Sequence, residues 1–388
     1  MPDTPTSRRT THAAPTATPT APASHVQPTP VFDWRALVAR SQPGDATTSQ
    51  RAQAARLGAA TAELTTWAEQ FGLLTAYVRP SAMFAVVCTP PDAPDDLTRS
   101  LAQLILWYYS FDTTLDSQPL ERIGDPAWVD AMISASVAPL LSDLRLSAVR
   151  RLGWLASAVT DVAPEEPAIT ARLSAALADW RETTFAPWER MAPHLLVRQF
   201  WRQTLAEQLA DAATAMRQEL TWTNAWRADR LVAPTMADYL RTAIRTTGVH
   251  PMLTLVCHAS GQSPAIWPQR RPLLNAAARV IRLANDASSA EADLTDQNIT
   301  AVTTALLRLP ADRARRTTTM FATTEVSGGR GAPGLPEQAL DRARAQVARR
   351  LDAAIVAFAR RLATQPDGPD ADYLRYTVAW ALAHYGQG

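Results

Sequence analysis

Residues 274–293 read LNAAARVIRLANDASSAEAD, an apolar stripe followed by polar residues. Its apolar residues recur every three or four positions, which is the period of an α-helix and not of a β-strand. Beyond Ile281 on this apolar stripe, Asn285, Ser289 and Asp293 follow at intervals of four. An amide oxygen, a hydroxyl and a carboxylate therefore share one helix face, and hard oxygen donors of this kind suit Mg²⁺. An exposed polar helix end is the alternative interpretation.

A second segment repeats the combination of an apolar stripe with acids. Residues 101–116 read LAQLILWYYSFDTTLD, so Asp112 and Asp116 lie one turn apart on the face that carries the apolar residues. Carboxylates at the end of a helix face the negative end of its dipole, and a cation should compensate them. Bound Mg²⁺ is one candidate, and a solvated helix end is the other.

The rest of the chain follows the same helical period. From Val31 onward the segments are rich in Ala, Leu, Arg and Glu, and no alternating Val/Ile/Thr run suggests a sheet. We therefore predict an all-α fold. The expected helices are at residues 50–74, 97–117, 127–144, 147–162, 167–184, 194–224, 235–247, 249–260, 270–295, 298–308, 310–324, 336–364 and 370–385.

The first residues differ in composition from the rest. Residues 1–30 are dominated by Thr, Pro, Ala and Ser, with hardly any large apolar residue. Such a segment cannot bury enough surface to offset the entropy of ordering it. We expect a disordered tail over residues 1–30 and one domain over residues 31–388.

Charge and cysteine content exclude several functions. The 38 basic and 37 acidic residues give a net charge of +1, which offers no electrostatic case for binding nucleic acid or an acidic membrane. Cys88 and Cys257 each lie in an apolar run, which argues against a disulfide framework or a zinc site. No apolar run reaches the roughly 18 residues of a membrane span. We expect a soluble, cytoplasmic protein without membrane insertion.

The two polar segments match motifs of one family. Residues 285–293, NDASSAEAD, resemble the NSE metal motif of class I terpene synthases, and residues 111–116, FDTTLD, resemble their aspartate-rich motif. Arg375 and Tyr376 resemble the RY pair of bacterial members. Over residues 50–385 the chain is thus identified as similar to the bacterial class I terpene synthase (terpene cyclase) family. Further segments that follow the family's order are residues 198–200, Glu219, residues 234–240 and residues 246–248.

The resemblance implies a fold and an activity. The fold would be a single-domain helical bundle around a central apolar cavity. The enzyme would use several Mg²⁺ ions to ionise a linear isoprenyl diphosphate, C15 farnesyl or C20 geranylgeranyl. It would cyclise the carbocation to a terpene hydrocarbon or alcohol and release diphosphate, as a carbon-oxygen lyase of isoprenoid secondary metabolism. It would act as a monomer or homodimer.

The resemblance also implies which residues hold the metal, with two departures from the family pattern. Thr113 stands where a second Asp is usual, and Asp293 stands where Glu is commoner. The metal shell should therefore be looser or differently shaped. The implied ligands are Asp112, Asp116, Asn285, Ser289 and Asp293.

The arginine that senses diphosphate in this family is displaced here. It usually lies four or five residues before the glycine of a helix break, but those positions before Gly248 are Ile244 and Ala243. Arg241 and Arg245 flank these two positions. We expect one of the two arginines to contact the diphosphate, and we favour Arg245 because it is nearer to Gly248. The resemblance implies that the diphosphate is gripped by Arg245 or Arg241 together with Arg375 and Tyr376.

Aromatic side chains near these motifs are candidates for lining the cavity. A ring face attracts a carbocation without reacting with it. Each ring taken singly is also consistent with ordinary core packing. The candidates are Phe84, Tyr108, Tyr109 and Trp380.

Two other functions fit parts of the sequence. A chain-elongating prenyl diphosphate synthase is also helical and Mg²⁺-dependent, but its pattern has two aspartate-rich motifs, whereas this chain has one. A non-catalytic helical scaffold would fit the degenerate aspartate-rich motif and the displaced arginine. Release of diphosphate from isoprenyl substrates distinguishes an enzyme from a scaffold.

Deleting residues 1–30 should leave both activity and melting temperature nearly unchanged, because this segment has too little apolar surface to pack on the domain. Turnover and thermal unfolding of the shortened and full chains test this. A large loss of either quantity would mean that the segment covers part of the functional site.

Overall fold

In the part of the chain that the computed structural model describes, all regular secondary structure is helical. No strand occurs within these residues, which confirms the all-α prediction. The tail predicted at residues 1–30 and the helices predicted at 147–162 and 310–324 lie outside the described residues. The described ranges are 46–90, 93–118, 120–143, 167–191, 195–230, 232–309 and 337–385.

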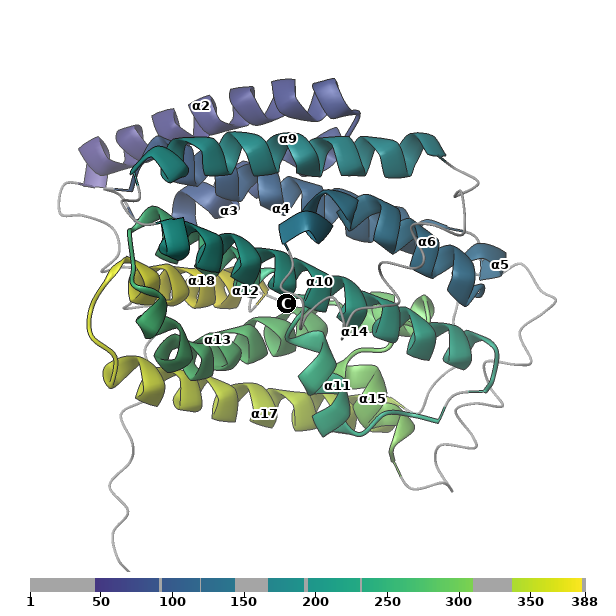
Figure 1. The fold of residues 1–388 in the computed structure, drawn as a ribbon. Helices are drawn as coiled ribbons and strands as arrows, with labels where there is room; N and C mark the ends of the chain where they lie inside the picture. The colour runs from purple at the N-terminus through teal and green to yellow at the C-terminus, as the bar shows by residue number, and fades with distance from the viewer. Residues whose placement is uncertain are drawn as a thin grey trace, which may run out of the picture. The chain divides into compact units, whose positions relative to one another are not determined.

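Long helices form most of the structure (Figure 1). They are α2 (Ala46–Phe71), α4 (Asp95–Asp116), α9 (Pro167–Met191), α10 (Leu195–Arg227), α13 (Trp267–Ser288), α17 (Glu337–Ala363) and α18 (Pro369–Tyr385). The shorter helices are α3 (Val78–Cys88), α5 (Leu120–Ile123), α6 (Pro126–Val137), α11 (Met236–Ala243), α12 (Val249–Ala259), α14 (Ala290–Thr295) and α15 (Ala301–Leu307). Three 3₁₀ segments are η1 (Thr75–Tyr77), η2 (Ala138–Asp143) and η3 (Pro264–Ile266).

Helices α3 and α13 differ from the sequence prediction for identifiable reasons. The sequence analysis expected no helix at α3, where Pro80 lies within the first turn, a place at which the missing N–H costs no helical hydrogen bond. The single helix expected at residues 270–295 ends at Ser288, and α14 begins at Ala290. The backbone N–H of Ser289 donates to the carbonyl of Asn285 at 3.0 Å, and the Ser289 hydroxyl oxygen lies 3.0 Å from the same carbonyl, an additional contact that often bends a helix.

Helix α12 occupies a central place between the two groups of helices that carry the motifs. It contacts α4 on one side and α13 on the other, and it also touches α10 and α18. Helix α4 is further covered by α2, α3 and α9, whereas α13 packs on α17 and α18 (Figure 1). The helices with the two polar segments are therefore held in fixed relation through shared neighbours.

Tryptophan side chains fix the position of α4 against α9. The indole of Trp107 donates to the carbonyl of Leu173 at 2.8 Å, and that of Trp180 donates to the carbonyl of Ser100 at 2.9 Å. Both rings are almost fully buried. Each indole thus buries a large apolar area while its N–H remains satisfied, which stabilises one defined register between the two helices.

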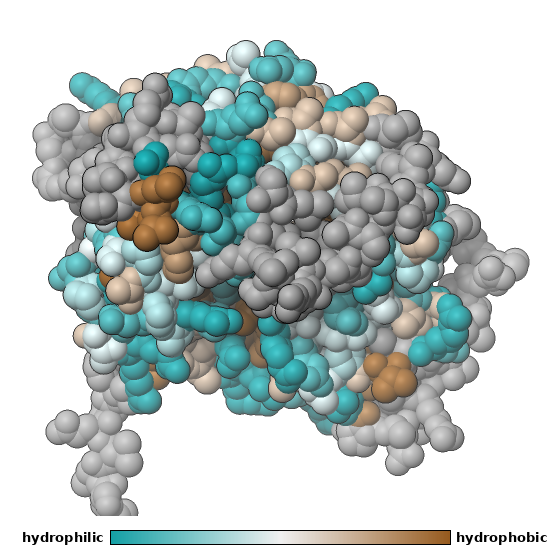
Figure 2. Space-filling model, in the orientation of Figure 1, coloured by the Kyte–Doolittle hydropathy of each residue, from teal (hydrophilic) through white to brown (hydrophobic). Residues whose placement is uncertain are grey.

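The outer surface carries few large apolar side chains. Figure 2 shows mostly hydrophilic or neutral residues with small separate apolar groups, apart from the grey atoms. No described helix combines the length and the apolar character needed to cross a membrane. The described large apolar residues that are exposed are Leu74, Leu195, Leu196 and Val232.

A buried ion pair joins the beginning of α13 to the beginning of α18. The side chains of Arg270 and Asp370 are 2% and 0% exposed and are in direct contact. Arg270 also donates to the Gln365 side chain at 2.7 Å. Because both charges have left water, removing one of them leaves the other uncompensated in the core.

Replacing Asp370 by Ala should therefore lower the free energy of unfolding by about 3–5 kcal/mol. The control is Glu63→Gln, which breaks the contact to Arg99 at 2.7 Å between two side chains that are each about half exposed. That change should cost about 1 kcal/mol or less. Urea unfolding followed by circular dichroism measures both. An equal loss of unfolding free energy in both variants would show that the buried ion pair contributes no more to stability than the exposed one.

Candidate active site

All five predicted metal ligands line one pocket between α4, α10 and the α13–α14 junction. Its volume is about 230 Å³. The helices bring the two polar segments of the sequence to opposite sides of this space, although about 170 residues separate them along the chain. The lining residues are Asp112, Leu115, Asp116, Ile123, Met216, Glu219, Leu220, Thr223, Arg227, Thr246, Arg282, Asn285, Asp286, Ser289, Asp293, Asn298, Ile299 and Thr300.

Helix α4 supplies one wall of the pocket through its last turn. Solvent reaches the Asp112 side chain through the pocket, while protein atoms crowd the carboxylate from the other sides. This desolvation, with the negative charge of Glu219 added to it, raises the pKa of Asp112 to about 6. The positive charge of Arg282 acts in the opposite direction. The wall thus holds negative charge that is only partly compensated.

Asp116 links this wall electrostatically to the facing one. Burial and the neighbouring charge of Asp112 raise the pKa of Asp116 to about 7, and Asp293 on the opposite wall adds to the effect. Arg227 and Arg282 oppose it. The carboxylates of the two walls are therefore near enough to repel one another. Carboxylates that bind a common cation are often this close together.

The facing wall is the junction of α13 with α14. The Ser289 hydroxyl donates to Asp293 Oδ2 at 2.6 Å, and the backbone N–H of Asp293 bonds to the carbonyl of Ser289 at 2.9 Å. The helix break therefore keeps the spacing of one turn that the sequence predicted. Asn285, one turn before Ser289, lines the same pocket, so three different oxygen donors share this wall.

Asp286 lies next to the candidate ligand Asn285 but has a different environment. Its side chain is fully buried. Its Oδ2 accepts the Tyr239 hydroxyl at 2.7 Å and the N–H of Ala301 at 3.0 Å, and its Oδ1 lies 2.9 Å from Nε of Arg282. The aspartate thereby joins α13 to α11 and to the first turn of α15. Sequence analysis assigned it no such role.

Two further charged residues of the pocket received no role from the sequence. Glu219 of α10 has its pKa raised to about 7, by burial first and by Asp286 in addition. Arg282 of α13 lies one turn before Asn285, and this spacing in the sequence was the available signal that it faces the same side. Nη2 of Arg282 lies 3.6 Å from Oε1 of Glu219.

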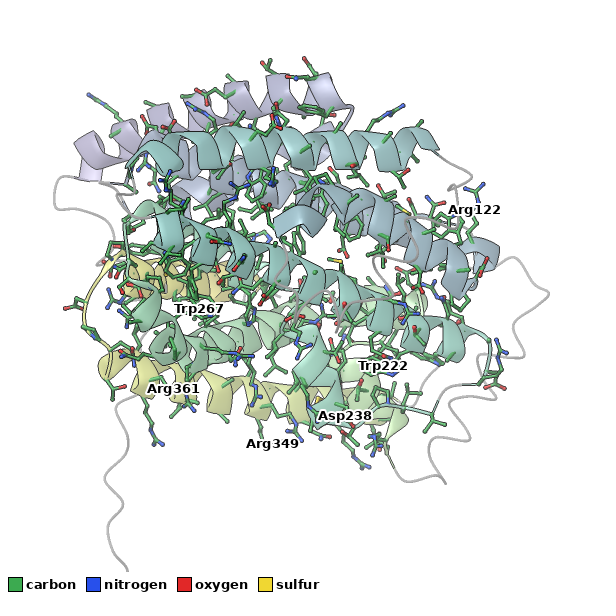
Figure 3. The ribbon with its side chains drawn as sticks, viewed as in Figure 1. Arg122, Trp222, Asp238, Trp267, Arg349 and Arg361 are labelled. Atoms are coloured by element: carbon green, nitrogen blue, oxygen red, sulfur yellow. The ribbon has the colours of Figure 1, made fainter. Side chains whose placement is uncertain are left out.

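The structure does not bring Arg241 or Arg245 to this pocket, and their contact with diphosphate stays a prediction. Both line a separate pocket with His250. Arg241 donates to Asp238 at 2.9 Å, and Figure 3 shows Asp238 on α11. Helix α11 buries its Tyr239 side and leaves Arg241 exposed. Arg245 follows the end of α11 at Ala243, earlier than predicted, and is exposed as well.

Arg375 and Tyr376 are also absent from the residues that line the pocket. Arg375 contacts Asp372 directly and lies 3.6 Å from Asp367, beside the start of α18. The end of the same helix lies nearer to the pocket: burial raises the pKa of Tyr385, and the charge of Arg282, which lines the pocket, opposes that rise. Ten residues, about 15 Å of helix, separate Tyr385 from Arg375. The contact of Arg375 and Tyr376 with diphosphate therefore stays a prediction.

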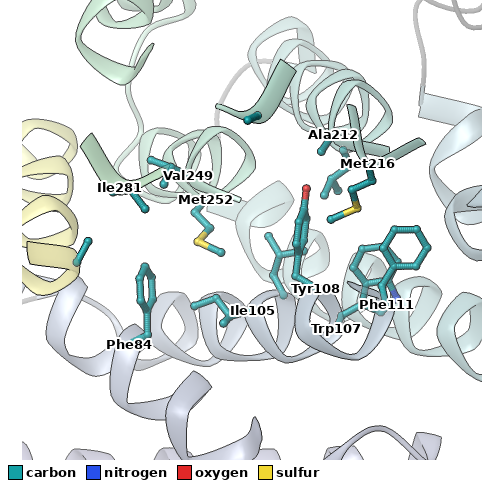
Figure 4. Close-up of a cluster of buried hydrophobic side chains, with 14 of the residues drawn as sticks. Phe84, Ile105, Trp107, Tyr108, Phe111, Ala212, Met216, Val249, Met252 and Ile281 are labelled. Atoms are coloured by element: carbon teal, nitrogen blue, oxygen red, sulfur yellow. The ribbon is translucent and has the colours of Figure 1, made fainter. Parts of the chain in front are cut away.

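The four candidate aromatic residues pack in or against the hydrophobic core instead of lining the acidic pocket. Phe84 meets Trp380 edge to face at 4.7 Å, and Tyr109 stacks on Tyr77 at 5.1 Å. Figure 4 shows Phe84 and Tyr108 among aliphatic side chains and methionines. The buried Tyr108 hydroxyl has no hydrogen-bond partner among the described residues. Its phenol lies close enough to Asp112 for that charge to act on its pKa.

Known proteins resemble this chain in sequence profile and in fold. The profile of terpene synthase family 2, C-terminal metal binding, matches residues 145–318. This range includes the α13–α14 wall of the pocket. No curated protein sequence matches the chain.

Solved structures share the fold at low sequence identity. Linalool/nerolidol synthase from Streptomyces clavuligerus is 16% identical with a TM-score of 0.53, and the match covers 85% of this chain and 96% of that one. 2-Methylisoborneol synthase from Streptomyces coelicolor A3(2) is 16% identical with a TM-score of 0.53, and the match covers 86% of this chain and 90% of that one. Isoprene synthase from grey poplar leaves is 15% identical with a TM-score of 0.57, and the match covers 92% of this chain and 56% of that one. The chain thus resembles terpene synthase family 2 in sequence profile over residues 145–318, and it shares its helical fold with these solved structures.

Proposed function

We propose that the protein is a class I terpene synthase that ionises farnesyl or geranylgeranyl diphosphate with Mg²⁺ and cyclises the resulting carbocation. The observation that carries this proposal is the shared pocket of Asp112 on α4 with Asn285, Ser289 and Asp293 at the α13–α14 junction. The buried free cysteines Cys88 and Cys257 support the expectation of a cytoplasmic enzyme.

The donor set of the pocket fits Mg²⁺. Its candidate ligands are all oxygens, and burial and mutual repulsion raise the pKa of both Asp112 and Asp116, so an added cation would relieve unfavourable charge. Among the described residues, no three His, Cys, Asp or Glu side chains are grouped tightly enough to hold a metal ion. The amide of Asn285, the hydroxyl of Ser289, water and phosphate oxygens would complete the shell.

The proposed reaction begins with heterolysis of the bond between C1 of the isoprenyl chain and the diphosphate oxygen. Both bonding electrons leave with the oxygen, and an allylic carbocation remains. The oxygens of Asp112, Asn285, Ser289 and Asp293 would hold Mg²⁺, which would supply positive charge where negative charge develops on the leaving group. The solved 2-methylisoborneol synthase was obtained with Mg²⁺ and geranyl-S-thiolodiphosphate, which supports this assignment for a related fold.

The apolar side of the pocket suits the hydrocarbon part of such a substrate. Met216 lines the pocket and also belongs to the apolar cluster in Figure 4, which contains Tyr108. We assign Phe84, Tyr108, Tyr109 and Trp380 to the stabilisation of the carbocation through their ring faces. Exclusion of water keeps the cation alive until rings have closed. Loss of a proton or capture of water then ends the reaction, as a hydrocarbon or an alcohol.

Replacing Asn285 or Ser289 by Ala should lower the rate of diphosphate release at least ~100-fold, because each change removes an oxygen donor of the pocket. The rate is measured with the C10, C15 and C20 diphosphates, with Mg²⁺ and with EDTA, and products are identified by mass spectrometry. The exposed neighbour Ser288 provides the control Ser288→Ala, which should keep the parent rate. No release by the parent chain with any substrate would favour a non-catalytic scaffold.

Replacing Asp112 by Asn should have opposite effects on stability with and without metal. Without Mg²⁺ the melting temperature should rise slightly, by about 2–4 °C, because one of several repelling carboxylates becomes neutral and solvent screens part of the gain. The stabilisation of the parent by Mg²⁺ with diphosphate should be largely lost in the variant. Thermal unfolding under both conditions measures this, and equal stabilisation of both proteins would remove Asp112 from the metal site.

A further inference from the structure

The turn that follows α14 lies beside the candidate metal ligand Asp293 and has an unusual backbone. Gln297 has a φ of 55°, in the left-handed region that residues other than glycine seldom adopt. Among the described residues other than glycine, only Asp229, just beyond the end of α10, shares this property. Such a conformation is unfavourable and persists where surrounding contacts hold it. The turn at residues 296–298 is therefore fixed by its neighbours.

Asn298 is the residue of this turn whose backbone is held most firmly. Its N–H donates to the carbonyl of Asp293 at 2.7 Å, and its own carbonyl lies 2.9 Å from the Thr303 hydroxyl of α15. The next residue anchors the turn to α10, because the N–H of Ile299 donates to the Thr223 hydroxyl at 3.2 Å. The backbone of Asn298 is thus fixed relative to α10, α14 and α15, which restricts where its side chain can lie.

The side-chain amide of Asn298 connects a cation to an anion. Its oxygen accepts a hydrogen bond from Nη2 of Arg227 at 3.0 Å, and the side chain is also hydrogen-bonded to the carboxylate of Asp293. A guanidinium only donates and an ionised carboxylate only accepts, so these partners need one acceptor and one donor between them. An amide supplies both. An aspartate of the same size would repel Asp293, and a leucine would bond to neither partner.

Arg227 is held to the same turn by a second set of bonds. Its Nε and Nη2 donate to the carbonyl of Asp296 at 3.1 and 2.8 Å. Arg227 is the last residue of α10, so these bonds join the end of that helix to the turn after α14. The guanidinium therefore reaches the amide oxygen of Asn298 from a position that does not depend on Asn298 alone.

The carboxylate of Asp293 is oriented by two hydrogen-bond donors. The Ser289 hydroxyl donates to its Oδ2 at 2.6 Å, and the Asn298 amide is the second donor. Burial raises the pKa of Asp293, and both hydrogen bonds act against that rise because they favour the ionised form. A carboxylate has about four lone-pair sites, so two donors orient it and still leave sites for a cation.

We infer that Asn298, with its amide oxygen held by Arg227, is a positioning residue that orients the carboxylate of Asp293 for binding Mg²⁺. This inference rests on the proposed function and adds to that site a residue with no role in the sequence analysis. Asn298 acts through Asp293 and not on the substrate. Partners that orient a metal ligand in this way commonly change metal affinity by about 10- to 100-fold when they are removed.

The test is binding of Mg²⁺ to the full chain, measured by titration calorimetry, together with the Mg²⁺ concentration that gives half the maximal rate of diphosphate release. Asn298→Leu keeps the approximate size of the side chain and removes both hydrogen bonds. It should weaken Mg²⁺ binding about 10- to 100-fold and raise the Mg²⁺ requirement to match. At saturating Mg²⁺ the rate should return to within about threefold of the parent. Asn298→Gln keeps the amide on a longer side chain and should lose less affinity.

Gln297→Ala is the matched control, because Gln297 belongs to the same turn but is not among the residues that line the pocket. It should bind Mg²⁺ like the parent. A purely structural role of Asn298 would lower the melting temperature while Mg²⁺ affinity stays at the parent value, and would overturn the inference. If the Leu variant does not fold, the Gln variant, compared with the same control, decides in its place.

A double-mutant cycle with Asp293→Asn shows whether Asn298 acts through Asp293. In the Asp293→Asn background, adding Asn298→Leu should change the remaining Mg²⁺ affinity less than about threefold, because the carboxylate that it orients is already absent. An undiminished loss in that background would overturn the inference. If Asp293→Asn binds no Mg²⁺, the loss in Asn298→Leu relative to Gln297→Ala decides alone.

Failure of this inference is distinguishable from failure of the proposed function. A parent chain that releases diphosphate with Mg²⁺, while both Asn298 variants bind Mg²⁺ like the parent, would overturn the inference and leave the proposed function standing. A parent chain that neither binds Mg²⁺ nor releases diphosphate from isoprenyl substrates would overturn the proposed function, and this inference with it.

Discussion

The buried carboxylate of Asp286 organises the part of the molecule on which the candidate site depends. It accepts hydrogen bonds from Tyr239 and from the backbone of Ala301, and it contacts Arg282. One side chain thereby joins α11, α13 and α15. Because a buried charge is tolerated only when it is well paired, these partners are held in a single arrangement. That arrangement sets where the adjacent Asn285 points and where the Arg282 fork ends.

The pocket next to this network contains charges that fold stability alone would not favour. Burial and neighbouring negative charges raise the pKa values of Asp112, Asp116 and Glu219. The ionised carboxylates therefore lower the stability of the folded chain. Firm helix contacts elsewhere offset such a cost, including the tryptophan bonds between α4 and α9 and the Arg270–Asp370 pair. Several carboxylates with raised pKa values that face one pocket are typical of functional sites.

The cations of the structure divide into distinct tasks. Arg270 stabilises the junction of α13 and α18, Arg227 ties the end of α10 to a neighbouring turn, and Arg282 points its terminal nitrogens toward the acidic pocket. The basic residues that sequence comparison favoured are exposed or paired elsewhere. Contacts that fix the side chain keep a guanidinium at one position. Tyr239 and Asp286 provide such contacts to Nε of Arg282.

The sequence by itself determined the helical class and the two oxygen-donor segments. Both depend on spacing along one helix, where residues four apart share a face, and Asn285, Ser289 and Asp293 keep that relation even across the break at Ser289. The same reasoning predicted a continuous helix there, because a hydroxyl that lies against a carbonyl of the preceding turn leaves no mark on periodicity.

Only the tertiary structure decided which cations meet those acids. Arg241 and Arg245 are as well placed in the sequence as Arg282, but α11 packs with Tyr239 buried, and the two arginines line another pocket. The contacts of Arg282 with Glu219 and Thr246 join residues that are 63 and 36 positions apart. Local periodicity carries no information about such pairs, because their distance depends on how whole helices pack.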